Sequence, residues 1–182
     1  MEQKAYFEHL GRAVEDKRFS HMMALALDPG SEYKQGIIRC ITSREGDVEI
    51  KGYVDRSRLF TVSGESPEHF IVGEQLQIKN EEEILRELTP KGWECIGLED
   101  PDIWIDEKTG LMHIYFTIPI KPSNPEEKIR IHLGHAVGKD LHSLEMTEPI
   151  LLHDEAMNAS AKEVSIAPIN SKGFRYNLIE SR

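Results

Sequence analysis

Short strand-like runs that end in turn-forming residues recur along the chain, and this recurrence limits the fold more than any other feature of the sequence. The segments ALALDPG, DIWIDEKTG and SIAPINSKG each finish an apolar or alternating run in a turn, and they recur at intervals of roughly 60 to 80 residues. Glycine, proline, asparagine and aspartate favour turn conformations. The pattern therefore predicts an all-β fold built from short antiparallel strands.

The order of strands and turns is similar in each repeating unit. The predicted strands lie at 23–27, 36–42, 58–63 and 70–72 in the first unit, at 102–106, 111–117, 128–138 and 148–153 in the second, and at 164–169 and 175–179 in the third. Repeated four-stranded units are typical of a β-propeller. A β-sandwich also has short strands and turns, but it does not repeat their internal order.

This pattern predicts a partial propeller behind an N-terminal extension. The extension covers residues 1–21, where a weak helical pattern is present, and the propeller covers 22–182. Blade one is expected at about 22–90, blade two at about 98–153 and the start of blade three at about 160–182, with a helical connector at NEEEILRELTP. Two and a half blades do not close a ring. We therefore expect a homo-oligomer or further C-terminal blades.

The charge balance narrows the classes of partner. The chain has 182 residues, enough for one well-buried domain, with 22 basic and 32 acidic side chains and a formal net charge of −10. Binding to nucleic acid or to an anionic membrane needs a local excess of lysine and arginine, so neither is expected. A neutral or polar small molecule suits this charge better.

The thiols and the apolar segments indicate a cytoplasmic protein. Cys40 and Cys95 have no metal-ligand or redox-pair spacing, and free reduced thiols are the expected state. The first seventeen residues carry charges throughout, unlike a signal peptide, and no apolar run approaches the roughly 18 residues that span a bilayer. His132 and His135 lie three residues apart on a predicted strand and should face opposite sides, so no metal site is expected.

Five segments resemble, in order, the motifs of one enzyme family. They are SRLFTVSGESPEHF, GLEDPDI, MHIYFT, HLGHAVGKDLHSLEM and AKEVSIAPINSKGFRYNLI. Their pattern is similar to glycoside hydrolase family 130, the β-mannoside phosphorylases and mannosidases, within the five-bladed propeller glycosidases. The resemblance implies an enzyme without a cofactor that cleaves β-mannosides or related oligosaccharides by inverting hydrolysis or by phosphorolysis. Its substrates would be an oligosaccharide and, in phosphorolysis, inorganic phosphate.

The resemblance also implies roles for single residues. Asp100 of GLEDPDI would be the general acid, and Glu163, at the start of the third blade, would be a second channel acid. Glu99, Arg39 and Arg58 would surround the sugar. Like-charge repulsion from Glu99 could raise the pKa of Asp100. Trp104 is a candidate stacking platform for the sugar, although packing in the core or between blades is equally compatible with its position on a strand.

Several residues depart from the family pattern. Asp102 stands where the family has arginine, Glu163 replaces an aspartate, Ala167 replaces a phenylalanine and Leu144 replaces a tryptophan. These changes weaken the phosphorylase interpretation more than the fold, and they fit a hydrolase subgroup, a distant branch of the family or a protein that has lost activity. Asp28 matches an acid of related propellers, but the sequence DPG is sufficient to explain it as a turn residue.

A non-catalytic partial propeller that binds carbohydrate, or that is purely structural, is the alternative to an enzyme. The two hypotheses differ in what surrounds Asp100. A catalytic role requires a basic cluster or a second acid in the same channel as Asp100. That role should be abandoned if Asp100 is buried in a salt bridge or faces bulk solvent.

Overall fold

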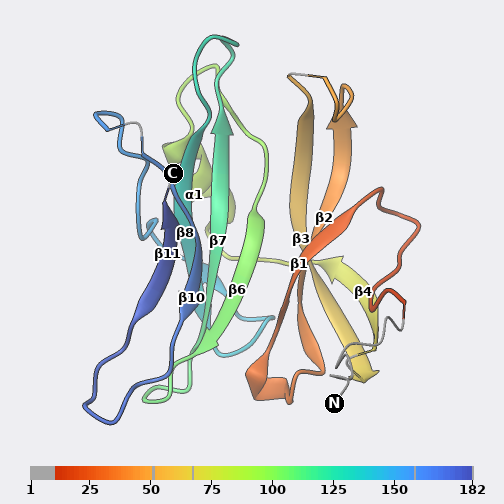
Figure 1. The fold of residues 1–182 in the computed structure, drawn as a ribbon, viewed down its shortest axis with the longest axis vertical. Helices are drawn as coiled ribbons and strands as arrows, with labels where there is room; N and C mark the ends of the chain where they lie inside the picture. Colours follow the sequence, from red (N-terminus) through yellow and green to blue (C-terminus); the bar gives the residue numbers. More distant parts are fainter. Residues whose placement is uncertain (1–10, 51, 67, 158, 182) are drawn as a thin grey trace, which may run out of the picture.

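The computed structural model describes residues 11–50, 52–66, 68–157 and 159–181, and these residues form a mostly β structure (Figure 1). Three antiparallel sheets follow one another along the chain. The all-β prediction is confirmed at this level. Among the described residues, the helical elements are α1 (Glu81–Leu88) and the 3-10 turn η1 (Pro29–Ser31).

The first sheet contains four strands in chain order. They are β1 (Met22–Leu27), β2 (Gln35–Glu45), β3 (Val54–Ser66) and β4 (His69–Gln75). Asp28 ends β1 as the N-cap of η1, where its carboxylate accepts a 2.7 Å hydrogen bond from the backbone N–H of Gly30. The turn role predicted for Asp28 is thus confirmed.

The second and third sheets follow α1. The second contains β5 (Glu94–Cys95), β6 (Glu99–Ile105), β7 (Met112–Lys121), β8 (Arg130–Gly138) and β9 (Glu145–Met146), and β7 pairs with β5, β6 and β8. The third sheet is the hairpin of β10 (Ala161–Ile166) and β11 (Asn177–Ser181). The NSKG turn closes this hairpin, because Asn170 and Phe174 pair through their backbones.

The sheets stand side by side, with the first on the right of Figure 1 and the third on the left. Ile37 and Leu59 of the first sheet meet Ile114, Phe116 and other residues of the second in the largest buried core. A smaller cluster joins the second and third sheets. It contains Leu133, Ala161 and Val164. Burial of these apolar side chains between facing sheets is the main stabilising contribution.

One strand of each sheet carries the same irregularity. The pairing register shifts after Met23 in β1, after Glu99 in β6 and after Lys162 in β10. The next residue in each strand has a left-handed backbone, with φ of 51° at Ala24, 47° at Asp100 and 51° at Glu163. A register shift with an extra residue is a β-bulge, which bends the strand and re-aims a side chain. The three strands are therefore structural equivalents.

The return strand of the second sheet lies earlier in the chain than the sequence predicts. The sequence predicts it at 148–153, but β9 lies at Glu145–Met146, and Leu151 makes only an isolated bridge with Leu133. The reason is a tight turn after β8, in which the Ser143 hydroxyl accepts hydrogen bonds from the backbones of Lys139 and Asp140. This turn brings the chain back to the sheet a few residues earlier than the apolar pattern suggests.

The N-terminal extension is described only from residue 11. Residues 11–21 are irregular apart from a bridge between Val14 and Phe70, and they cover the outer core of the first sheet. The helical pattern over residues 1–10 lies outside the described residues. The predicted connector helix is confirmed as α1, which begins at Glu81. Among the described residues no helix is long and apolar enough to cross a membrane.

Two buried histidines on β8 have lowered pKa values. His132 is 6 % exposed and His135 is 7 % exposed. Burial, followed by neighbouring positive charge, lowers the pKa of each to about 4. His132 Nδ1 accepts from the backbone N–H of His153 at 3.0 Å, and His135 lies in hydrogen-bonding contact with His113 and Thr147. Both side chains are therefore neutral in the folded protein at pH 7.

Acidification should destabilise the fold through these two histidines. Their pKa in the folded protein lies below the ordinary histidine value of 6.5, so their contribution to stability is complete above pH 6.5 and is lost as the pH falls towards 4. We expect the free energy of unfolding to fall by on the order of 1–2 kcal/mol per histidine between pH 7 and pH 5. Urea titrations of the protein and of His135→Gln measure this. An identical pH slope in both proteins would contradict the assignment for His135.

Candidate functional site

A network of charged side chains joins the three sheets. Arg39 of β2 crosses to the start of β6, where its Nη2 lies 2.6 Å from Glu99 Oε1 and its Nη1 lies 2.9 Å from Asp100 Oδ1. The Nε of Arg39 donates to Ser57 Oγ at 2.9 Å. One guanidinium thus contacts two carboxylates and a hydroxyl, a use for which its planar set of donors is suited.

A close backbone contact sets the position of these acids. Ser57 of β3 bridges to Gly97, and its N–H donates to the carbonyl of Ile96 at 3.1 Å. A Cβ atom at Gly97 would lie 2.4 Å from the carbonyl oxygen of Ser57. Only glycine lets the chain approach this closely. The Ser57 hydroxyl also donates, at 3.1 Å, to Oε1 of Glu99, which lies two residues after Gly97.

The third sheet adds a lysine and a further acid. Lys162 Nζ lies 2.8 Å from Glu163 Oε1 and 3.7 Å from Asp100 Oδ2. Asp100 therefore lies between Arg39 of the first sheet and Lys162 of the third. The structure brings together four of the six site residues predicted from the sequence, namely Asp100, Glu163, Glu99 and Arg39.

Most of this network is withdrawn from solvent. The side chains of Arg39, Glu99 and Asp100 are 13 %, 15 % and 17 % exposed, whereas that of Glu163 is 48 % exposed. Burial raises the pKa of Glu99, and Arg39 only partly offsets this. Burial also tends to lower the pKa of Lys162, but Glu163 and Asp100 outweigh it, and that pKa is raised.

A hollow of about 300 Å³ opens beside the network. Asp100, Asp102, Glu163 and Glu180 supply its acidic lining, and apolar and neutral residues of β10 and β11 complete it. Burial raises the pKa of Asp102, although the backbone N–H of Ile103 partly opposes the shift. The hollow is thus lined by several carboxylates in different environments.

Arg58 and Trp104, the other two predicted residues, lie apart from the network. Arg58 donates to the carbonyl of Ser57 at 2.8 Å, and its charge acts to lower the pKa of Glu81 and of Glu94. Trp104 packs against His113, with 4.9 Å between the ring centroids, and Arg175 lies 4.0 Å above its ring. A cation thus already covers one face of the Trp104 ring.

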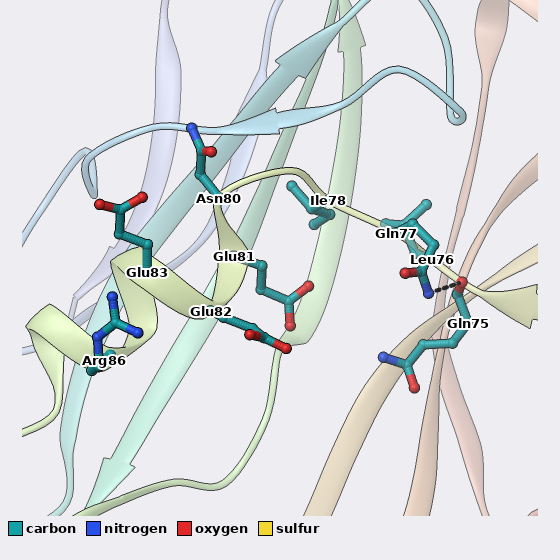
Figure 2. Close-up of a pocket in the computed structure, with 9 residues that line it drawn as sticks. All are labelled: Gln75, Leu76, Gln77, Ile78, Asn80, Glu81, Glu82, Glu83 and Arg86. Carbon is teal, nitrogen blue, oxygen red and sulfur yellow. Dashed lines mark hydrogen bonds between the residues drawn. The ribbon is translucent and has the colours of Figure 1, made fainter.

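A separate hollow of about 450 Å³ lies at the start of α1 (Figure 2). Figure 2 shows that the linker after β4 and the first turns of α1 line it, with Glu81, Glu82 and Glu83 among the lining residues. Burial raises the pKa of Glu81. Of the residues predicted from the sequence to form a site, none lines this hollow among those described. The network around Asp100 is therefore the candidate site.

Three residues of the candidate site were missed in the sequence. Ser57 is fully buried and shows no signal before the strand pairing is known. Lys162 precedes Glu163 directly, so its nearness to the site could have been inferred from that adjacency. Asp102 was read only as a departure from the family pattern, although its distance of two residues from Asp100 on a strand was a usable signal.

Comparisons with known proteins give this chain no family. No protein-family model matches it, and no curated protein matches it. The resemblance to glycoside hydrolase family 130 therefore stays a prediction.

Removal of the Arg39 charge should destabilise the protein markedly. Arg39→Gln leaves two largely buried carboxylates without their main partner, and we expect the free energy of unfolding to fall by about 3 kcal/mol. Lys34→Gln is the control, because Lys34 and Glu32 form a surface pair 3.3 Å apart that should contribute less than about 1 kcal/mol. Denaturant titration measures both changes. Equal effects would show that the network does not hold the sheets together.

Proposed function

We propose that the protein binds an oligosaccharide of the β-mannoside type at the network around Asp100. The observation that carries this proposal is the gathering of Arg39, Asp100, Lys162 and Glu163 from three sheets beside one open hollow. Charged side chains with several donors and acceptors suit the hydroxyl groups of a sugar. The resemblance of GLEDPDI to the family motif supplies the class of sugar.

Asp100 is proposed as a binding residue rather than as the general acid. A general acid must hold a proton before the reaction and release it to the leaving oxygen. The side chain of Asp100 is 17 % exposed and paired with Arg39 and Lys162. These two ion pairs support a binding role, although a basic cluster and a second acid share its surroundings.

Cleavage of the sugar is the second candidate function, because the hollow contains a different pair of acids. Asp102 and Glu163 both line it, from neighbouring sheets. Burial raises the pKa of Asp102, as a general acid requires, while Glu163 is half-exposed and paired with Lys162. In this variant of the proposal, Asp102 protonates the leaving oxygen and Glu163 activates water for inverting hydrolysis.

Calorimetric titration with mannotriose tests the binding proposal. We expect saturable binding by the unaltered protein and at least a tenfold weaker affinity for Asp100→Asn, because the amide removes one charge that Arg39 and Lys162 share. Asp47→Asn changes an exposed carboxylate in a distant turn and should bind as the parent does. Absence of binding by the parent protein, or equal binding by all three, would refute the proposal.

Product analysis with the same proteins separates binding from cleavage. Mannotriose is incubated with and without inorganic phosphate, and the released sugars are separated by chromatography. Under the cleavage candidate, free mannose forms without phosphate, and Asp102→Asn lowers the rate about a hundredfold or more. Binding without product in either buffer would leave the protein as a carbohydrate-binding module.

A blade-like arrangement of the three sheets is part of the proposal. The support is the equivalence of β1, β6 and β10, which share a register shift followed by a left-handed residue. In a propeller the first strand of each blade lines the central channel. That geometry is consistent with contacts from the first and third sheets to one carboxylate of the second.

The third sheet supports association with further strands. It holds only two strands in the described residues. Tyr176, just before β11, is 72 % exposed, and Leu178, within β11, is 76 % exposed. An apolar edge strand favours pairing with another chain. We therefore propose a homo-oligomer through this sheet.

Light scattering after size exclusion tests the association. We expect a mass above that of the monomer, and we expect Leu178→Lys to shift the distribution towards monomer, because a charge on an edge opposes strand pairing. Ile71→Lys places the same charge on the first sheet, at a side chain that is 66 % exposed, and should leave the mass unchanged. A compact monomer at high concentration would count against the proposal.

A further inference from the structure

The three equivalent strands do not contribute equivalent side chains. The last residue before the register shift is Glu99 in β6 and Lys162 in β10, and both lie in the charged network. In β1 the same place is held by Met23. The left-handed residue that follows is acidic in the second and third sheets, whereas in the first it is Ala24. One of the three strands therefore brings an apolar pair to positions that are charged in the other two.

Met23 lies close to the network. It is the cross-strand partner of Arg39, so the two side chains project from the same face of the first sheet. Ile37 and Ala26, one pair further along, project from that face into the core against the second sheet. At the pair formed by Met23 and Arg39, the Arg39 side chain instead reaches Glu99 and Asp100. Met23 thus occupies the level of the candidate site rather than that of the core.

Met23 is not covered by the rest of the protein. Its exposure is 38 %, whereas Ala26 on the same strand is 8 % exposed. Ala24 is also exposed. Two successive apolar residues therefore remain in contact with solvent beside a charged network that is 13–17 % exposed at Arg39, Glu99 and Asp100. An exposed apolar patch next to a polar site is a usual feature of ligand-binding surfaces.

We propose that Met23 and Ala24 form an apolar subsite that takes an alkyl or aryl group attached to the bound sugar. This inference rests on the proposed function, because it extends the ligand from the hollow beside Glu163, across Asp100, to β1. Charges at positions 23 and 24 would hydrogen-bond to hydroxyl groups, as Glu99 and Asp100 can. A methyl thioether and a methyl group instead stabilise an apolar group by removing it from water.

Two ligands that differ only in the attached group test the subsite. We expect calorimetric titration of the full chain to show that benzyl β-mannobioside binds about five- to tenfold more tightly than methyl β-mannobioside. Met23→Gln keeps the side-chain length and removes the apolar character, and it should reduce this preference to less than about twofold. The affinity for the methyl glycoside should stay within about twofold of the parent value.

Two further variants keep the test decisive. Ala24→Asp places a carboxylate in the left-handed conformation that aspartate tolerates, and it should also reduce the benzyl preference. Ile71→Gln changes an exposed apolar residue on β4 and should retain it. Thermal melting of each variant confirms folding before titration.

Each result decides between the two proposals. Equal binding of both ligands by the parent protein, or an unchanged benzyl preference in Met23→Gln and Ala24→Asp, would overturn the apolar subsite while the sugar-binding proposal stands. Absence of binding by either ligand to the parent protein would overturn both.

Discussion

The paired charges of Arg39, Glu99 and Asp100 are the interaction on which the rest of the structure depends. Apolar side chains such as Ile37 and Phe116 hold the first two sheets together, but an apolar contact tolerates small shifts of one sheet against the other. A guanidinium that contacts two largely buried carboxylates does not tolerate such shifts, because a displacement would leave a charge unpaired in a region of low dielectric. The network therefore fixes the level at which the strands meet. Lys162 extends the same constraint to the third sheet.

The left-handed residues show that the network is maintained against a local cost. A residue other than glycine at φ near 50° is strained by roughly 1–3 kcal/mol, and the residue before a proline is restricted further, as Asp100 is before Pro101. The cost is repeated at Glu163, which pairs with Lys162, and at Ala24, which carries no charge. The bulge is thus a property of the repeated strand rather than of the charges. Asp100 and Glu163 carry their charges on a left-handed backbone conformation that Ala24 of the first sheet also has.

The sequence was sufficient for the elements that depend on local pattern. The alternation in LMHIYFT, the DPG and NSKG turns and the acidic start of α1 all lie where the residues predicted them. The sequence was insufficient where a contact between residues far apart in the chain determines the structure. The early return at β9 depends on the Ser143 turn, and the burial of Ser57 depends on the approach of Gly97. For the site, GLEDPDI and AKEVSI located the acids, but Arg58 and Trp104 lie elsewhere because side-chain partners, not strand positions, determine where a long or aromatic residue points.

The charge of the site also bears on the choice between phosphate and water. Two cations, Arg39 and Lys162, face three carboxylates, Glu99, Asp100 and Glu163, and each cation already has an acidic partner within 3 Å. A phosphate ion would have to compete with these carboxylates for the same donors and would enter a field of its own sign. Asp102, where the resembling family has arginine, adds a further acid to the hollow. A neutral sugar meets no such opposition. Binding of the sugar, with or without hydrolysis, is therefore better supported by the electrostatics than phosphorolysis is.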